Sequence, residues 1–375
     1  MNTRTIALAL CLLGAAAPGR ALPPPRPPAC VPAGAAVTIG VLEAILAGKG
    51  DSPLRDCAVN DLAARGAAAV PVAVRMLGAG DSDSAMLALA LLSALGPTAQ
   101  AALPALMDQV RTPSPALHLN PGGLYDAVGA LGAAGGPAIP LLIARSRAPY
   151  YRYYAVGALG KLGKYDAGRV VPHLVSTLEG REGRLLPLDT SAVLGALADI
   201  GKGARAALPA TLAALERAKA AGESMDASAA IRALLALAEP GESIPVLVGL
   251  FDHPMLAYSA VEGLALIGPA AASAAPALID KLNRSREEPH MPDRIVSALA
   301  AIGPELPAVQ QQLLIEATQY QRWTAAYALA HGGPLPFHFA AALAAALAKK
   351  PGDVFLGIAL KNVRRGPAAG TQGGN

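Results

Sequence analysis

The sequence predicts an all-α fold, a right-handed α-α superhelix (an α-solenoid) of about eight or nine antiparallel helix pairs. Three observations predict it: a small and aliphatic apolar content, a repeating arrangement of Gly and Pro, and the near absence of strand-like alternation. Hydrophobic residues make up 53% of the 375 residues, whereas aromatic residues account for 4% and charged residues for 15%. This composition excludes a disordered chain, and a count of three Cys excludes a disulfide-dense small scaffold.

One module recurs along the chain: an apolar helix, a Gly-containing turn, and a Pro that opens a second apolar helix. The turn reads LGPTAQAALPAL at 95–106, LGAAGGPAIPLL at 131–142 and IGKGARAALPATL at 200–212. Pro has no N–H group and a helical φ, so the first turn of a helix tolerates it. Gly after the first helix can adopt the left-handed conformation that ends a helix. The recurring prolines stand 31 to 37 residues apart, at Pro71, Pro104, Pro140, Pro172, Pro209, Pro245, Pro276 and Pro307.

The helical segments carry apolar stripes that a lone helix pair cannot cover. Ala155, Leu159 and Leu162 form a stripe at helical spacing in one first helix, and Leu208, Leu212 and Leu215 form one in a second helix. Ala and Gly let helices approach one another closely, and Ala favours the helix itself. Successive pairs are therefore expected to stack into a solenoid, in which each pair covers its neighbour.

This pattern resembles HEAT repeats, most closely the short bacterial type related to the phycobilisome-lyase-like repeats. That type favours an Arg early in the first helix, an A-x-x-A-L-G core, and a Pro opening the second helix. Arg152 with AVGALGKLG at 155–163 and Arg322 with AAYALAHGG at 325–333 match it well, and Arg55 with AVNDLAARG matches in part. The resemblance covers about residues 40–350 and implies an interaction scaffold, since only a minority of such proteins are enzymes. Other repeats depart from the motif and carry Ala85, Leu124 or Ala257 at the Arg position.

The N-terminus has the features of a secretory signal peptide over residues 1–21. Arg4 precedes an uncharged apolar stretch, and small residues near position 21 offer a cleavage point. The stretch is too short to span a bilayer, although an uncleaved anchor or a buried helix is the alternative. A proline-rich segment follows at 22–39, and the tail at 364–375 is Gly-rich and expected to be disordered. We therefore expect a secreted or periplasmic protein, and the repeat type points to a bacterial one.

Export changes the interpretation of both charge and Cys. The signal peptide holds two Arg and no acid, so its removal lowers the formal net charge from +4 to +2. That value disfavours a nucleic-acid partner. The mature chain keeps Cys30 and Cys57, which an oxidising compartment would join in one disulfide. Such a bridge would contribute roughly 3 kcal/mol. The alternative is two unpaired buried thiols.

The sequence contains no recognisable catalytic or metal-binding motif. There is no H-E-x-x-H, and the paired His-Glu motifs of the HEAT-like metal hydroxylases are missing. The six His are too scattered for a ligand set: His118, His173, His253, His290, His331 and His338. We therefore expect no catalysis, no metal and no cofactor. The alternative is a lyase-like or hydroxylase-like HEAT enzyme.

A cluster of four Tyr stands out as a candidate binding site. Tyr150, Tyr151, Tyr153 and Tyr154 surround Arg152, and neighbouring residues on a helix point in different directions, so at least one Tyr should be exposed. Tyr beside Arg is typical of protein-binding hot spots and of sites that stack sugar rings or cations. The alternative is packing between repeats, for which Gly157 and Gly160 would make room.

Together these observations favour an exported scaffold that binds a protein or peptide in the cell envelope. The alternatives are the enzyme above and a carbohydrate or lipid-headgroup binder that uses the Tyr cluster. No apolar run after the signal peptide reads as transmembrane, and the sequence leaves the oligomeric state open. The binding surface is expected on a concave face built from second helices, with candidate contacts at His173, Thr177, Arg217, Asp280 and Lys281.

Overall fold

The computed structural model describes residues 38–48, 53–119, 121–180 and 187–363. The predicted signal peptide, the proline-rich segment up to residue 37, and the tail at 364–375 lie outside the described residues. The chain divides into two compact units, residues 1–65 and residues 66–375.

The described part of the first unit is a pair of helices, α2 (Ile39–Ala47) and α3 (Pro53–Ala63), which contact each other. Leu42 and Leu62 are fully buried. An Arg55 Nη atom lies 3.4 Å from the carbonyl oxygen of Leu46, to which it donates a hydrogen bond near the end of α2. Cys57 is disulfide-bonded. Cys30 lies outside the described residues, so the pairing of these two Cys stays a prediction.

The second unit consists of paired helices. Among its described residues, eight pairs follow one another between residues 82 and 349. The first helices of these pairs are α5 (Ser82–Leu95), α8 (Gly122–Ala130), α10 (Pro149–Gly163), α12 (Pro187–Ile200), α14 (Ser224–Leu237), α16 (Ala257–Ile267), α18 (Met291–Ile302) and α20 (Trp323–His331). The second helices are α6 (Leu103–Arg111), α9 (Ile139–Ser146), α11 (Ala167–Leu178), α13 (Leu208–Ala221), α15 (Pro240–Val248), α17 (Ala275–Arg284), α19 (Pro307–Thr318) and α21 (Ala340–Lys349).

Three further helices complete this unit. The helix α4 (Val70–Leu77) precedes the first of these pairs, the short helix α7 (Pro115–Leu119) lies in the connection between α6 and α8, and α22 (Val354–Lys361) follows the last pair.

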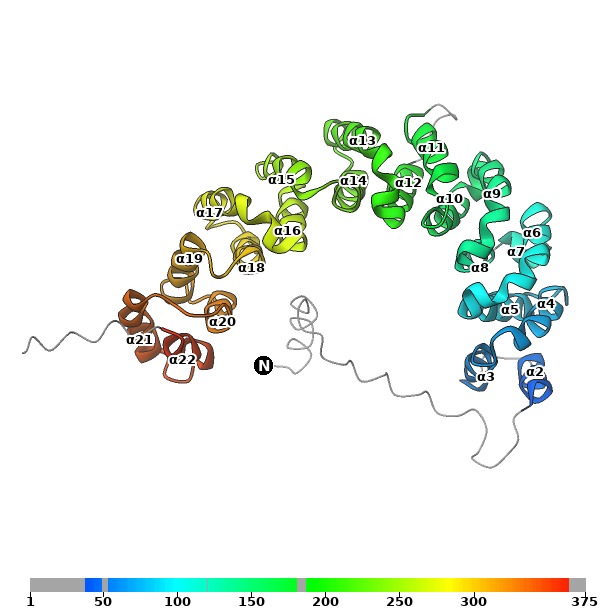
Figure 1. Ribbon diagram of the computed structural model, residues 1–375, viewed down its shortest axis with the longest axis horizontal. Coiled ribbons are helices and arrows are strands. Elements are labelled where there is room, and N and C mark those ends of the chain that lie inside the picture. Colours follow the sequence, from blue (N-terminus) through cyan, green and yellow to red (C-terminus); the bar gives the residue numbers. More distant parts are fainter. Residues whose placement is uncertain (1–37, 49–52, 120, 181–186, 364–375) are drawn as a thin grey trace, which may run out of the picture. The chain divides into compact units, whose positions relative to one another are not determined.

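The helices of the second unit lie in two rows (Figure 1). In the first-helix row, every helix from α5 to α22 contacts the next first helix, with α22 closing the row. In the other row, α6, α9, α11 and α13 contact one another in turn, as do α17, α19 and α21. The described residues contain no β-strand, apart from one isolated bridge between Leu335 and Val363. The predicted all-α solenoid of helix pairs is confirmed.

The repeated Gly and Pro end one helix and begin the next. Four first helices end in a 3-10 turn that opens with a Gly of positive φ, for example 55° at Gly96 and 68° at Gly268. Positive φ is accessible to Gly at little cost. Pro104 and Pro209 then stand in the first turn of the second helix, as predicted.

Two of the recurring prolines do not open their helices. Pro172 and Pro245 lie in the second turns of α11 and α15, because both helices begin earlier than the sequence suggested. Asp166 caps α11 by accepting a hydrogen bond from the N–H of Arg169 at 3.2 Å. In α15, Glu239 and Glu242 form a reciprocal capping box. Side-chain caps therefore replace the Gly turn in these two repeats.

Small residues allow neighbouring first helices to touch. A Cβ atom added to Gly160 of α10 would lie 2.8 Å from the Cα atom of Ala196 in α12. Gly160 thus makes room for a neighbouring backbone and not for Tyr rings, which the packing alternative would place there. Gly157, one turn earlier, has no atom within 4 Å of an added Cβ and faces open space.

The Arg of the repeat motif has a structural role in α10. Arg152 is 6% exposed, and its Nε atom donates to the carbonyl oxygen of Ser146, the last residue of α9, at 2.9 Å. Its Nη1 atom lies 2.7 Å from an oxygen of the buried Asp189 carboxylate in α12. One side chain therefore satisfies the end of the preceding helix and joins its own repeat to the next.

Two helical stretches, Ser82–Arg111 and Ala257–Arg284, are long and apolar enough to cross a membrane by length and composition alone. A third stretch, Gly122–Ala130 with Gly132–Ser146, is long and apolar enough to cross a membrane only if its two parts are taken as one span. The chain bends by 119° between these two parts. Each of the two longer stretches joins a first helix, a kinked 3-10 turn and a second helix of one pair. The absence of a membrane span after the signal peptide stays a prediction.

We expect Arg152→Met to lower the free energy of unfolding by about 3–5 kcal/mol, because it removes both the buried ion pair with the Asp189 carboxylate and the hydrogen bond to the Ser146 carbonyl. The matched control is Lys161→Met, which breaks an exposed pair with Asp126 and should cost at most about 1 kcal/mol. Denaturant-induced unfolding measures both. Equal losses in the two variants would contradict the structural role of Arg152.

Substitution of the two Gly of α10 should have opposite effects on stability. Gly160→Ala forces α10 away from Ala196 and should cost about 1–3 kcal/mol. Gly157→Ala meets open space and should stabilise the helix by about 0.5–1 kcal/mol. Thermal unfolding of both variants tests this, and a stabilised Gly160→Ala protein would show that the two helices are not in close contact there.

Candidate functional site

An open cleft of about 480 Å³, here called the first cleft, lies on the first-helix row. Its walls come from four consecutive first helices, α8, α10, α12 and α14. It therefore lies on the row of first helices, and the expected surface of second helices does not contribute to it.

The floor of the first cleft is made by glycines. Gly157 of α10 and Gly195 of α12 both line it, and an added Cβ atom at either position would meet no atom within 4 Å. Each stands five residues before an apolar residue at or next to the end of its helix, Leu162 in α10 and Ile200 in α12. The same position holds Asp126 in α8 and Arg232 in α14. Across these four consecutive first helices, the position therefore holds Asp, Gly, Gly and Arg in turn.

Aromatic rings form one wall of the first cleft. The ring of Tyr154 stacks on that of Tyr125, with centroids 6.2 Å apart, and meets the ring of Tyr153 edge-on at 5.5 Å. Tyr153 is 53% exposed, whereas Tyr125 is buried. Burial raises the pKa of Tyr125 to about 12, although the positive charge of Arg145 opposes this shift. The Tyr125 hydroxyl therefore stays protonated over the physiological range.

Charged side chains at the first cleft differ in whether they are paired. Asp126 accepts a hydrogen bond from the Lys161 ammonium at 2.6 Å. Within the described part of the chain, no hydrogen bond or ion pair engages Asp199 of α12 or Arg232 of α14, and both are exposed. These two side chains are available to a ligand.

A second cleft of about 590 Å³ adjoins the first cleft. It is lined by residues of α14 and α16 and by the start of α15, among them Leu235 and Leu266. Arg232 lines both clefts. The Lys202 ammonium at this second cleft is already bound, to the Ala238 carbonyl at 2.6 Å and to the Glu239 carboxylate at 2.9 Å.

The structure divides the predicted Tyr cluster into two parts. Tyr153 and Tyr154 line the first cleft, as a binding site would require. Tyr150 and Tyr151 instead contact His118 of α7: the Tyr150 hydroxyl donates to the His118 carbonyl at 2.7 Å, and the Tyr151 hydroxyl lies 2.8 Å from His118 Nδ1. These two residues hold the connection between repeats in place, which is the packing alternative.

The second-helix candidates differ in their exposure. His173, Thr177 and Lys281 are buried, whereas Arg217 and Asp280 are exposed. Contact of these residues with a ligand stays a prediction. His173 Nε2 lies 2.7 Å from the Ser146 hydroxyl of α9, and the Thr177 hydroxyl donates to the His173 carbonyl. Arg217 donates to the carbonyl of Leu178, the last residue of α11, at 3.0 Å. Polar side chains on the second helices, the exposed Arg217 among them, thus join neighbouring repeats.

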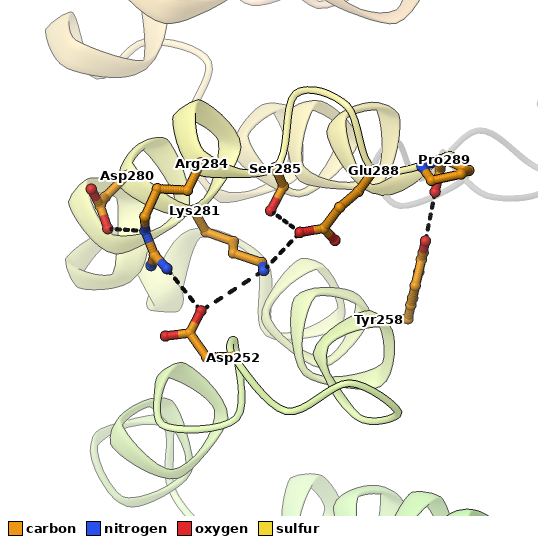
Figure 2. A network of polar contacts seen from close by, with 8 residues as sticks. All are labelled: Asp252, Tyr258, Asp280, Lys281, Arg284, Ser285, Glu288 and Pro289. Carbon is orange, nitrogen blue, oxygen red and sulfur yellow. Dashed lines mark hydrogen bonds and ion pairs between the residues drawn. The ribbon is translucent and has the colours of Figure 1, made fainter.

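Lys281 and Asp280 belong to a polar network that fixes the connection after α17 (Figure 2). The Lys281 ammonium lies 3.3 Å from Glu288 and 3.8 Å from Asp252. Arg284 bridges Asp252 and Asp280, and its hydrogen bond lowers the pKa of Asp252. The hydroxyl of Tyr258 at the start of α16 donates to the Pro289 carbonyl at 2.6 Å. This network orders the connection and leaves Lys281 little access to a ligand.

The described ranges hold no cluster of side chains suited to a metal ion. No three His, Cys, Asp or Glu side chains among them lie close enough to hold a metal ion. The clefts carry no paired nucleophile and base, since their ionisable groups are Asp126, Asp199, Lys202, Arg232, Glu239 and the Tyr hydroxyls. The arrangement is suited to binding.

Asp226, in the first turn of α14, should make stability depend on pH. Burial, together with Glu223, raises the pKa of Asp226, against hydrogen bonds from Thr190 and Ser191 that lower it. The folded state therefore holds this proton to higher pH than the unfolded chain does, and the free energy of unfolding should fall as pH rises through the raised pKa. Asp226→Asn keeps an acceptor oxygen and should remove this fall.

The measurement for Asp226→Asn is denaturant unfolding at a series of pH values between about 4 and 8. Asp199→Asn, at an exposed and unpaired position, is the matched control and should keep the wild-type pH dependence. A wild-type pH dependence in the Asp226→Asn protein would show that Asp226 does not cause it.

Comparison with known proteins supports the architecture. No model of a known protein family matches the chain, and no curated protein sequence matches it. Among solved structures, the chain is similar to the crystal structure of the karyopherin Kap121p bound to the extreme C-terminus of the protein phosphatase Cdc14p. The match has a TM-score of 0.51 and 12% sequence identity, and covers 86% of this chain and 44% of the karyopherin chain. This chain thus spans less than half of that one, and the likeness concerns the fold: both are helical-repeat solenoids.

Proposed function

We propose that this protein is an exported HEAT-repeat scaffold of the bacterial cell envelope that binds an extended segment of a protein partner in the first cleft. The observation that carries the proposal is the open glycine floor at Gly157 and Gly195, between the Tyr153 wall and the unpaired Arg232. No catalytic step is part of this function.

A glycine floor suits the backbone of a polypeptide. Where a helix lacks a Cβ atom, a ligand can approach its backbone closely, and Gly in a helix interior costs about 0.5–1 kcal/mol relative to Ala. Gly157 and Gly195 gain no neighbour in return, unlike Gly160, which admits Ala196. Two such positions in consecutive repeats make a shallow track that crosses the helices. Extended segments commonly bind in grooves of this kind, with side chains placed in pockets on either side.

The walls of the first cleft favour a protein ligand over a small polar one. Tyr153 and Met225 are 53% and 64% exposed, and these large apolar side chains would be covered by a bound segment. The solenoid structure similar to this chain contains a karyopherin with the C-terminus of another protein bound to it. Export rests on the signal-peptide features of residues 1–21, and the HEAT assignment rests on the recurrent Gly, Pro and Arg pattern.

The test fills the first cleft without disturbing packing. We expect the double variant Gly157→Leu/Gly195→Leu to fold normally, because both added side chains enter open space, and to lose partner binding at least about tenfold, as expected when a central contact is blocked. A photo-crosslinking amino acid at the exposed Met225 would capture the partner in envelope fractions of the native host, and mass spectrometry would locate the captured segment.

The matched control is Gly357→Leu in α22, which also meets open space but lies outside the clefts. It should capture the same partner segment as the parent protein. Equal capture by the double variant and by Gly357→Leu would overturn the proposal, as would failure to recover any partner segment through Met225.

A further inference from the structure

We propose that the first and second clefts form one groove, which takes an extended partner segment of about ten to twelve residues with a carboxylate side chain nearer the end that lies at α16 and apolar side chains on both sides. Arg232 binds that carboxylate. This inference rests on the proposed function and specifies the ligand of the same site.

The two clefts are continuous at a single residue. Arg232 lines both, and together the clefts cross five consecutive first helices, from α8 to α16. Packed helices lie about 8–10 Å apart, so four steps span roughly 32–40 Å. An extended chain advances about 3.3 Å per residue, and this span therefore corresponds to about ten to twelve residues.

The charge pattern of the groove selects a carboxylate at Arg232. The other cation at the groove, Lys202, is already held by Glu239 and by the Ala238 carbonyl. Arg232 is exposed, and no side chain or carbonyl among the described residues pairs with it. A guanidinium binds a carboxylate through two parallel hydrogen bonds, which makes this pair both strong and directional. Asp199, also unpaired, favours a basic residue of the ligand on the neighbouring helix.

Apolar surface lies on both sides of Arg232. In the first cleft, Met225 at the start of α14 and Tyr153 of α10 are exposed. In the second cleft, Leu266 of α16 is 74% exposed, and Leu235 of α14 lines the same cleft. Large apolar side chains that border a polar centre are typical of interaction sites. The ligand side chains that flank the carboxylate are therefore apolar.

The same pattern argues against a nucleic acid in the groove. Asp126, Asp199 and Glu239 all line it, and a phosphate backbone would meet these three acids along the path that leads to one free guanidinium. The recessed glycine floor likewise suits a narrow chain and not a flat bilayer surface.

The experiment exchanges the charge of Arg232. A library of random linear peptides displayed on phage is selected against the purified full chain and against Arg232→Glu. The wild-type protein should enrich peptides with Asp or Glu at one position between apolar residues. Arg232→Glu should enrich Lys or Arg at that position and keep the apolar residues. Binding of the best wild-type peptide to Arg232→Glu should weaken roughly tenfold to a hundredfold by fluorescence polarisation.

Lys164→Glu is the matched control, since Lys164 is exposed, unpaired and outside both clefts. It makes the same charge change and should leave peptide affinity within about twofold, because exposed charges off the site are largely screened. Selected peptides that lack a common acid, or that bind Arg232→Glu as well as wild type, would overturn this inference and leave the proposed function standing. Peptides that bind Gly157→Leu/Gly195→Leu as tightly as wild type would place the binding site elsewhere and overturn both.

Discussion

The structure of the second unit depends on one constraint: a lone helix pair cannot cover its own apolar face, so each pair has to be covered by the next. Contact between α10 and α12 shows how close this approach is, because Gly160 leaves only the space that Ala196 fills. Stacking also buries backbone carbonyls at helix ends, and these then need hydrogen-bond donors. Arg152 and Arg217 both reach carbonyls at the end of a preceding helix, so the ends that stacking would bury keep their hydrogen bonds.

In α10, glycine serves helix packing at one position, Gly160, and lines the first cleft at another, Gly157. Gly160 faces the next first helix and closes the interface, whereas Gly157 lies almost one turn earlier and faces solvent. The difference is only the direction in which each position points around the helix. A solenoid of small residues can thus place a recess on its surface without changing the backbone, by omitting a side chain where no neighbour needs it.

The fold could be predicted from the sequence because its signals are local. The conformation of Gly96 and the place of Pro104 follow from backbone chemistry, and they recur in each similar turn. The candidate site was harder to predict, since it depends on which face of each helix a neighbour covers. His173 is polar but buried against α9, and Tyr151 is aromatic but used for packing. An alignment of the repeats on the apolar residue near the end of each first helix places Asp126, Gly157, Gly195 and Arg232 at one equivalent position. Residue type alone does not reveal this equivalence.

Repetition itself creates a difficulty for a groove ligand. Successive first helices present nearly equivalent surfaces about one helix spacing apart, so an extended segment could slide by one repeat and find similar contacts again. Arg232 breaks that equivalence, because it stands where the two preceding repeats have only glycine. In the proposed groove, the one large cationic side chain at this position would set the register of the bound chain. A repeated structure can thus define one register through a residue that the adjacent repeats lack.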